Sequence, residues 1–268
     1  MHRSHEIHFR SSAGAILAAL ALSTIPAVMA QSTSAPEWSL VTITTIKPDT
    51  RSEYEAWQKE ITAAYKKAEV PSRAVLQTVM GNLLEYVSVS PLTHFGNLDG
   101  PSPIERALGK EDAAGLMRKG SAYVTSVQRL ASRALDDLSI RTKTSEPSEY
   151  ALVTSMHLIA GKESEFNAWM KNEYLPAMKK AEVKNFWVSQ TMFGGDPNER
   201  IMVRVMKNMA EFDAGPVLNK ALGEEGARKL RAKSAGIVDS VHFSVLHYRT
   251  DLSYDMITQA GQKTASAK

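Results

Sequence analysis

The sequence contains no cysteine in its 268 residues. This absence excludes disulfide bonds, thiol nucleophiles, cysteine-ligated zinc and iron–sulfur clusters, so the fold must be stabilised by core packing. An excess of one charge is also lacking, because 32 Lys and Arg face 29 Asp and Glu. That balance, and the lack of a basic run interleaved with aromatic residues, predicts that nucleic acid is not a partner.

Recognisable cofactor and catalytic motifs are lacking as well. The sequence has no GxGxxG, no Walker phosphate loop, no HExxH and no GxSxG. No group of His, Asp and Glu has metal-ligand spacing. His242 and His247 are five residues apart on an expected strand, so their side chains would face opposite sides. We therefore expect no metal and no cofactor.

Long apolar runs are missing except near the N-terminus. Arg3 and Arg10 lead into AGAILAALALSTIPAVMA, which ends in small residues at Ala30. A charged start, an apolar segment and a small-residue end are typical of a signal peptide, which we place at residues 1–30. We expect a periplasmic or secreted product that does not associate with membrane after cleavage. A retained membrane anchor is the alternative, which Pro26 and the small residues disfavour.

The sequence does contain a long internal repeat. The pentapeptide KKAEV occurs at Lys66–Val70 and again at Lys179–Val183. Further matches are WSLVTITTI (38–46) with YALVTSMHLI (150–159), SEYEAWQKE (52–60) with SEFNAWMKN (164–172), and Leu108-Gly109 with Leu222-Gly223. The offset drifts from 112 to 113 to 114 residues, so single-residue insertions separate the copies. A period this long exceeds the roughly 20–50 residues of solenoid repeats and predicts a duplicated domain.

Each copy predicts the same order of elements. An alternating strand comes first, then a helix with Tyr54, Trp57 and Ile61 at helical spacing, two short strands around a glycine turn, a second helix and a last strand. Pro176 falls inside the first helix of the second copy and is expected to kink or end it. We expect a first unit at residues 38–140, a linker at 141–148, a second unit at 149–254 and a flexible tail at 255–268.

This βαββαβ order, present twice, resembles the dimeric α/β-barrel superfamily over about residues 38–254. The resemblance implies an α+β fold, in which the antiparallel sheets of two tandem ferredoxin-like units face each other as an intrachain pseudo-dimeric barrel. Family members include cofactor-free monooxygenases, NIPSNAP-like proteins and haem enzymes such as the chlorite dismutases. No histidine falls in the expected helices, so haem is not expected. One chain would close the barrel, which predicts a monomer as the minimal unit, with a further dimer possible.

The resemblance places a small-molecule ligand between the two sheets, so polar residues on the inward faces are informative. In the last strand the apolar set suits the helix layer and the polar set would point inward. The two sets are Val241, Phe243 and Val245 against His242, Ser244 and Tyr248. The apolar positions 201, 203 and 205 would likewise turn Arg204 inward. The candidate ligand-binding residues are Gln77, Gln190, Arg204, Ser244 and Tyr248, and the candidate general bases are His157 and His242.

Three functions remain open. The first is an exported barrel that binds a small, partly apolar or anionic molecule without transforming it. The second is a cofactor-free oxygenase-like or isomerase-like enzyme that uses a strand histidine as base. The third is a structural or interaction protein whose barrel is a packed core. The inward polar residues favour the first two, and the lack of a paired acid and base favours binding over catalysis.

Overall fold

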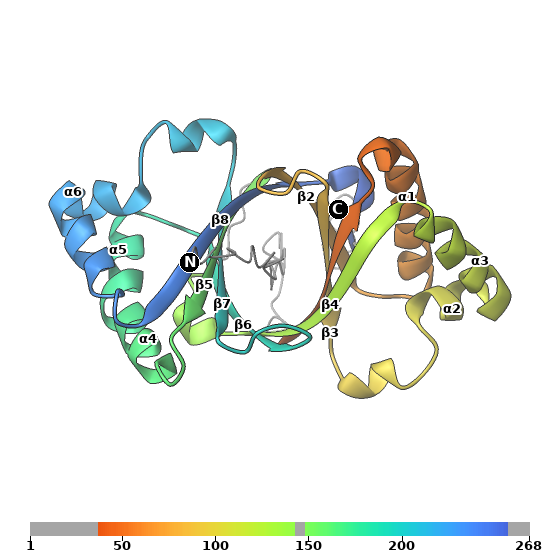
Figure 1. The fold of residues 1–268 in the computed structure, drawn as a ribbon, viewed down its shortest axis with the longest axis horizontal. Helices are drawn as coiled ribbons and strands as arrows, with labels where there is room; N and C mark the ends of the chain where they lie inside the picture. Colours follow the sequence, from red (N-terminus) through yellow and green to blue (C-terminus); the bar gives the residue numbers. More distant parts are fainter. Residues whose placement is uncertain (1–36, 143–147, 257–268) are drawn as a thin grey trace, which may run out of the picture.

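The computed structural model describes residues 37–142 and 148–256 of the chain (Figure 1). The first unit runs β1 Trp38–Ile46, α1 Arg51–Lys67, β2 Ser72–Met80, β3 Glu85–Leu92, α2 Pro103–Leu108, α3 Lys110–Ser121 and β4 Val124–Ala134. The second unit runs β5 Tyr150–Leu158, α4 Glu163–Trp169, a π-helical turn Met170–Tyr174, α5 Leu175–Lys180, β6 Phe186–Phe193, β7 Glu199–Met206, α6 Val217–Ala232 and β8 Val238–Tyr248. A two-residue strand, β9 Tyr254–Asp255, follows and pairs with β2. The expected signal peptide, and most of the expected linker and tail, lie outside the described residues.

Eight antiparallel strands close into a barrel. Their order is β3-β1-β4-β6-β7-β5-β8-β2, and a pairing of β2 with β3 completes the ring. Each unit supplies four neighbouring strands, and the units meet where β4 pairs with β6 and where β2 pairs with β8. Ring closure leaves no open edge among these eight strands. The fold is the dimeric α/β barrel, formed within one chain from two ferredoxin-like βαββαβ units, as the resemblance implied.

The helices lie on two opposite flanks of the barrel. Figure 1 shows α1–α3 outside the sheet of the first unit and α4–α6 outside the sheet of the second. Each helix layer packs on its sheet through a separate apolar cluster. Among the described residues, no helix has the length and apolar character needed to cross a membrane.

Side chains from both sheets meet inside the barrel and fill its middle. The buried members of this core are Val41, Ile43, Ala74, Leu76, Val87, Val89, Leu130, Ala151, Val153, Trp187, Ile201, Val203 and Leu246. Side chains alternate along a strand, so the residues between them face the helices. On β7, for example, Ile201 and Val203 belong to the barrel core while Met202 packs with the helices.

The repeated pentapeptide forms the same helix end in both units. Glu69 and Glu182 each adopt a left-handed backbone conformation, with φ of 59° and 61°. In both copies the amide of the following valine donates to the carbonyl oxygen five residues earlier, at 3.1 Å. This bond and the left-handed residue are the features of a Schellman helix end. The pentapeptide therefore recurs because each unit must reverse its chain between its first helix and its second strand.

The first helix of each unit differs in one respect. In the first unit α1 is continuous over 17 residues. In the second unit a single π-helical turn, Met170–Tyr174, separates α4 from α5. The offset between matching residues rises from 112 to 113 across this segment, so the turn accommodates one additional residue. Pro176, expected to kink or end the helix, lies in the first turn of α5, just after the interruption.

Candidate functional site

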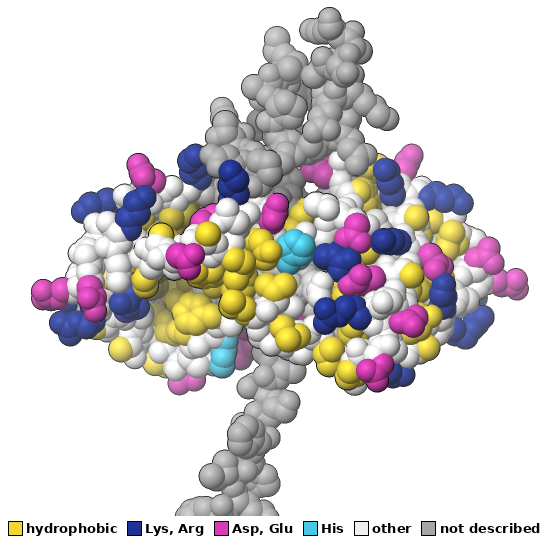
Figure 2. Space-filling model, turned by 90° about the horizontal axis from the view of Figure 1, so that it is seen from above, with side chains coloured by type: hydrophobic (Ala, Val, Ile, Leu, Met, Phe, Trp, Pro, Cys, Tyr) yellow, Lys and Arg dark blue, Asp and Glu magenta, His cyan; other side chains and the backbone are white. Residues whose placement is uncertain are grey.

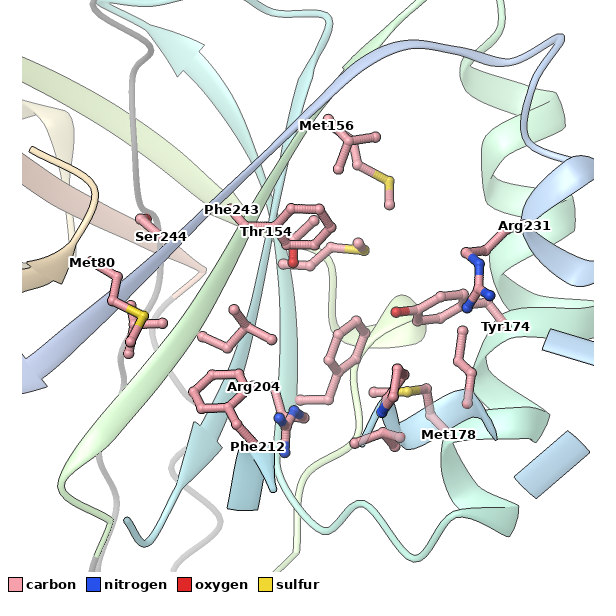
Figure 3. A pocket seen from close by; sticks show the side chains of 18 of the residues that line it. Met80, Thr154, Met156, Tyr174, Met178, Arg204, Phe212, Arg231, Phe243 and Ser244 are labelled. Atoms are coloured by element: carbon pink, nitrogen blue, oxygen red, sulfur yellow. The ribbon is translucent and has the colours of Figure 1, made fainter. Parts of the chain in front are cut away.

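A cavity of about 1220 Å³ lies on the helix-facing side of the second unit's sheet. Strands β5, β7 and β8 form its floor, the helices and the π-helical turn form its roof, and the segment 207–216 borders it (Figure 3). Most of its lining is apolar. These side chains include Leu152, Met156, Met178, Met202, Leu218, Val241 and Phe243. Figure 2 shows a hollow with apolar side chains gathered around it on the half that carries α4–α6.

Part of the apolar floor is exposed to solvent. Phe243 is 68% exposed, Met80 at the end of β2 is 53% exposed, and Val241 is 39% exposed. All three line the cavity. Large apolar side chains gathered at an open concave surface are typical of a binding site, because single exposed residues are common but contiguous patches are not.

The tryptophan of the first helix is held differently in the two units. In the first unit, Trp57 Nε1 donates to Leu116 O at 2.8 Å. A Cβ at Gly120 would lie 2.2 Å from the Trp57 ring, so only glycine lets α3 close on the indole. The second unit has Trp169 and Ser234 at the matching positions. Trp169 lines the cavity, and its buried Nε1 has no hydrogen-bond partner among the described residues.

The π-helical turn supplies a polar group to the roof. Its last residue, Tyr174, lines the cavity, and Figure 3 shows its side chain beside Arg231, with Arg204 on the sheet. Burial raises the pKa of Tyr174 to about 12, and the charges of Arg204 and Arg231 oppose this rise. The phenol is therefore protonated at neutral pH and lies within electrostatic reach of two guanidinium groups.

Arg204 anchors the border of the cavity. Its guanidinium donates to Glu211 Oε2 at 3.2 Å and to Met206 Sδ at 3.2 Å. Glu211 Oε1 in turn accepts the backbone amide of Lys207 at 2.6 Å. Burial lowers the pKa of Arg204, and the Glu211 carboxylate opposes this effect. Arg204 thus holds the segment after β7 over the floor while its charge remains next to the cavity.

The first unit has a smaller cavity at the matching place, of about 730 Å³. Its lining carries more charge. The charged members are Glu69, Glu105, Arg106, Lys110 and Arg129. Arg129 occupies the position of Phe243 on the floor, and Ser90 occupies that of Arg204. An apolar molecule would therefore find a continuous apolar floor only in the second unit.

The inward orientation expected for Arg204 and Gln190 is wrong. Arg204 lines the helix-side cavity, and Gln190 pairs opposite Arg200 on the same outer face, where its Nε2 donates to Pro197 O at 3.1 Å. The apolar set of β7 was expected to face the helices. It faces inward instead, because the middle of an eight-stranded barrel is just wide enough for such side chains to fill. That packed core occupies the space where the sequence placed a ligand.

The other predicted binding residues are dispersed. Gln77 Oε1 accepts a bond from Arg249 at 3.0 Å and does not reach the cavity. Tyr248 packs on the barrel core. Ser244 pairs opposite Val153 and contributes to the edge of the cavity. The structure therefore brings Arg204 and Ser244 to one cavity and leaves the two glutamines and Tyr248 elsewhere.

The two candidate bases also lie away from the cavity. His157 Nδ1 is 3.2 Å from Asp196 Oδ2, and its side chain is 38% exposed. His157 pairs opposite Glu199 at one end of the barrel, and His242 is exposed on β8. Neither imidazole lines the helix-side cavity, so neither can act as a base on a molecule bound there.

The predicted site residues did not include Trp169, Tyr174 and Arg231, which line the cavity. In the sequence, Trp57 and Trp169 occupy matching positions. Two signals distinguish the copies, however: the extra residue before Tyr174, and the serine at the position of Gly120. One signal lies in the first helix of the unit and the other just after α6, whereas ligand contacts were expected on the strands.

Comparison with known proteins shows the fold. No protein-family model matches the chain, and no curated protein matches it. A proposed monooxygenase from Lactobacillus acidophilus NCFM superimposes with a TM-score of 0.55 at 13% identity, over 82% of this chain and 96% of that one. An anthrone oxidase-like protein superimposes with a TM-score of 0.54 at 12% identity, over 82% of this chain and 93% of that protein. A proposed monooxygenase from Fusobacterium nucleatum superimposes with a TM-score of 0.52 at 10% identity, over 81% of this chain and 94% of that protein.

Proposed function

We propose that the protein binds a small, largely apolar molecule with an acidic or hydrogen-bond-accepting group in the cavity of the second unit. The observation that carries this proposal is the cavity itself: about 1220 Å³, apolar over most of its lining, with Trp169 Nε1, which has no partner in the described part of the chain, at its roof. Ligand cavities of about 300–1,000 Å³ with few polar groups are the usual form of small-molecule sites. The ligand site is thus placed outside the barrel, not between the sheets.

The polar groups that line the cavity support the second part of the proposal, which is an acidic or hydrogen-bond-accepting group on the ligand. Trp169 Nε1 and the Tyr174 hydroxyl can donate hydrogen bonds, and Arg204 brings a positive charge. All three favour a ligand oxygen that accepts hydrogen bonds or carries negative charge. The apolar floor would hold the rest of the ligand.

Two fluorescent probes test both parts. N-phenyl-1-naphthylamine and 1-anilinonaphthalene-8-sulfonate share a ring system, and only the second carries an anionic group. We expect each to bind one site per chain, with the sulfonate bound more tightly. The variant Val241→Asp places a charge on the apolar floor and should lower the affinity for both probes at least ten-fold.

The matched control is Val127→Asp. Val127 occupies the equivalent position on β4, is 60% exposed, and does not line the smaller cavity. Its probe affinities should equal those of the unmodified protein. Equal losses in both variants, or no saturable binding by either probe, would contradict the proposal and favour an interaction protein. Replacement of Arg204 by Met should lower the affinity for the sulfonate probe only.

A second candidate is cofactor-free oxygenation of the bound molecule. Its support is the fold shared with proteins named as a monooxygenase and an anthrone oxidase-like protein. The acid–base chemistry would fall to Tyr174 in place of a histidine, because neither imidazole reaches the cavity. Oxygen uptake with anthrone as substrate tests the idea. Uptake that is absent, or that is unchanged in Tyr174→Phe, would exclude this mechanism.

We also propose that residues 1–30 direct export and are removed after Ala30, to give a periplasmic or secreted monomer. The support is the charged, apolar and small-residue pattern of this segment, together with a barrel that one chain closes. The intact mass of the protein from the exported fraction should match a chain that begins at Gln31. Light scattering should give the mass of one chain. Retention of the full N-terminus would contradict the export.

A further inference from the structure

One end of the barrel interior is polar, in contrast to its apolar middle. Side chains at this end are buried although they carry oxygen atoms. They are Thr78, Glu85, Ser155, Ser189, Thr191, Glu199 and Ser244. Glu85 lies two residues before Val87 of the barrel core, and Glu199 lies two residues before Ile201. Alternation along the strands therefore turns both glutamates inward.

Glu85 and Glu199 face each other across the barrel. They are the first residues of β3 and β7, which lie four strands apart in either direction around the ring. The four intervening pairings are all antiparallel, so β3 and β7 run in the same direction and begin at the same end. Side chains from opposite walls of an eight-stranded barrel reach its centre. The two carboxyl groups thus lie at the same end of the barrel interior, on opposite walls.

Both carboxyl groups retain unused acceptor oxygens. Glu85 and Glu199 are each only 7% exposed, and Glu85 Oε1 and Glu199 Oε2 have no hydrogen-bond partner among the described residues. The other oxygen of Glu199 accepts a bond from Ser155 Oγ. Ser189, fully buried on the neighbouring strand β6, also has an unpartnered Oγ. Buried polar atoms are nearly always bonded, so these oxygens point to a bound group.

The charge at this end favours a cation. No Lys or Arg occupies an inward-facing position of the described strands there, and the basic groups are the imidazoles of His157 and His242. His157 is the cross-strand neighbour of Glu199 and is held by Asp196.

We propose that this end of the barrel binds a hydrated divalent cation of the Mg²⁺ type between Glu85 and Glu199. Oxygen ligands suit hard cations, and Mg²⁺ usually keeps several waters and is held by one or two carboxylates. Within the described ranges, no group of three or more His, Asp or Glu side chains is placed to ligate an ion directly. The cation therefore keeps part of its water shell, which reaches the second carboxyl oxygens and Ser189. This site lies on the opposite face of the sheet from the helix-side cavity and is independent of the proposed function.

Calorimetric titration of the chelator-treated protein with MgCl₂ tests the proposal. We expect one Mg²⁺ per chain, and at least ten-fold weaker binding in both Glu85→Gln and Glu199→Gln. The control is Glu53→Gln, because Glu53 is an exposed carboxylate on α1 and should leave the affinity unchanged. Unchanged binding in both barrel variants would overturn the site, as would the absence of binding to the unmodified protein.

A second measurement does not depend on the variants. Mn²⁺, a paramagnetic substitute for Mg²⁺, should lose its free-ion resonance signal when one equivalent of unmodified protein is added. Excess MgCl₂ should restore the signal, whereas excess butylammonium chloride should not. Restoration by butylammonium alone would show a site for an organic ammonium group and would overturn the metal assignment.

Discussion

The two units share their element order and their helix ends, yet of their two matching cavities, as the described residues line them, the one in the second unit is larger and more apolar. In the first unit α3 closes on Trp57, whose indole N–H is bonded to Leu116 O. In the second unit the matching Trp169 lines a cavity, and its N–H has no partner within residues 37–142 and 148–256. The close contact between α3 and Trp57 requires glycine at position 120, where a Cβ would lie 2.2 Å from the indole ring, whereas the second unit has Ser234 at the matching position.

The inserted residue adds to this difference. The additional residue in the second unit is absorbed by the π-helical turn Met170–Tyr174, which brings Tyr174 to the roof of the cavity. Single π-helical turns occur frequently at functional sites, because they displace one side chain without breaking the helix. The second unit therefore departs from the first where the candidate site lies.

The largest expected effect comes from giving the first unit the residue of the second. In Gly120→Ser, the new Cβ would lie 2.2 Å from the buried Trp57 ring, and such overpacking costs about 3 kcal/mol of unfolding free energy. Ser234→Gly meets no such ring and should change stability by less than about 1 kcal/mol. Urea unfolding followed by far-UV circular dichroism measures both. Equal losses in the two variants would contradict the assignment of Gly120 as the closing residue.

A second contrast lies where the units join. Arg249 donates to both carboxylate oxygens of Glu55, at 2.5 and 2.9 Å, and Tyr86 donates to the same carboxylate at 2.5 Å. The position that matches Glu55 is Asn167, whose Oδ1 is buried and unpartnered among the described residues. Among the described residues, Arg249 of the second unit thus forms this network with the first helix of the first unit, and Asn167 has no counterpart of it.

Glu55→Gln should therefore lower the unfolding free energy by about 2 kcal/mol at pH 7, since it removes the charge-assisted hydrogen bonds from Arg249 to Glu55 and leaves the guanidinium paired with Asp251 alone. The hydrogen bonds from Arg249 lower the pKa of Glu55 below its ordinary 4.5. The folded protein thus holds this proton less tightly than the unfolded chain, so the stabilisation is present above pH 4.5 and is lost as pH falls further. Unfolding at pH 7 and pH 3 should show the variant's deficit shrinking in acid. Asn167→Ala, the control, should change little at either pH.

The fold could be predicted from the sequence because the patterns that indicate it are local and occur in both copies of the repeat. Alternating strands, helical spacing and glycine turns occur in the same order twice, and each copy supports the assignment of the other. The helix end at KKAEV is set by the same five residues in both units. Closure of the ring follows from that order, because each unit leaves two sheet edges that the other can cover.

The candidate site was not predictable in the same way. Both faces of β7 read as suitable for burial, so periodicity could not decide which one met the helices. Arg204 was expected to point into the barrel interior. It lines the helix-side cavity instead and donates a hydrogen bond to Glu211. The cavity depends on how closely α6 approaches Trp169, a tertiary distance that no local pattern of residues specifies.

A smaller contrast separates the two tryptophans. Trp57→Phe removes the hydrogen bond to Leu116 O, which contributes about 1 kcal/mol to stability. Trp169→Phe removes an N–H that has no partner among the described residues, so its loss of stability should be smaller by about that amount. Probe binding should show the reverse order, with weaker binding of the sulfonate only in Trp169→Phe. Weaker binding in Trp57→Phe alone would place the ligand in the first unit.

The smallest expected effect concerns the feature that the units share. Glu69 and Glu182 both adopt the left-handed conformation that favours glycine. Glu69→Gly should therefore raise the unfolding free energy by about 0.5 kcal/mol, because the release of side-chain crowding outweighs the greater freedom of glycine in the unfolded chain. Glu182→Gly should gain slightly less, since it also removes an exposed ion pair with Lys220 at 3.2 Å, and such pairs contribute between about 0 and 1 kcal/mol. Urea unfolding in 1 M salt, which screens that pair, should bring the two gains together. A gain in one unit and a loss in the other would show that the identical pentapeptides do not play identical structural roles.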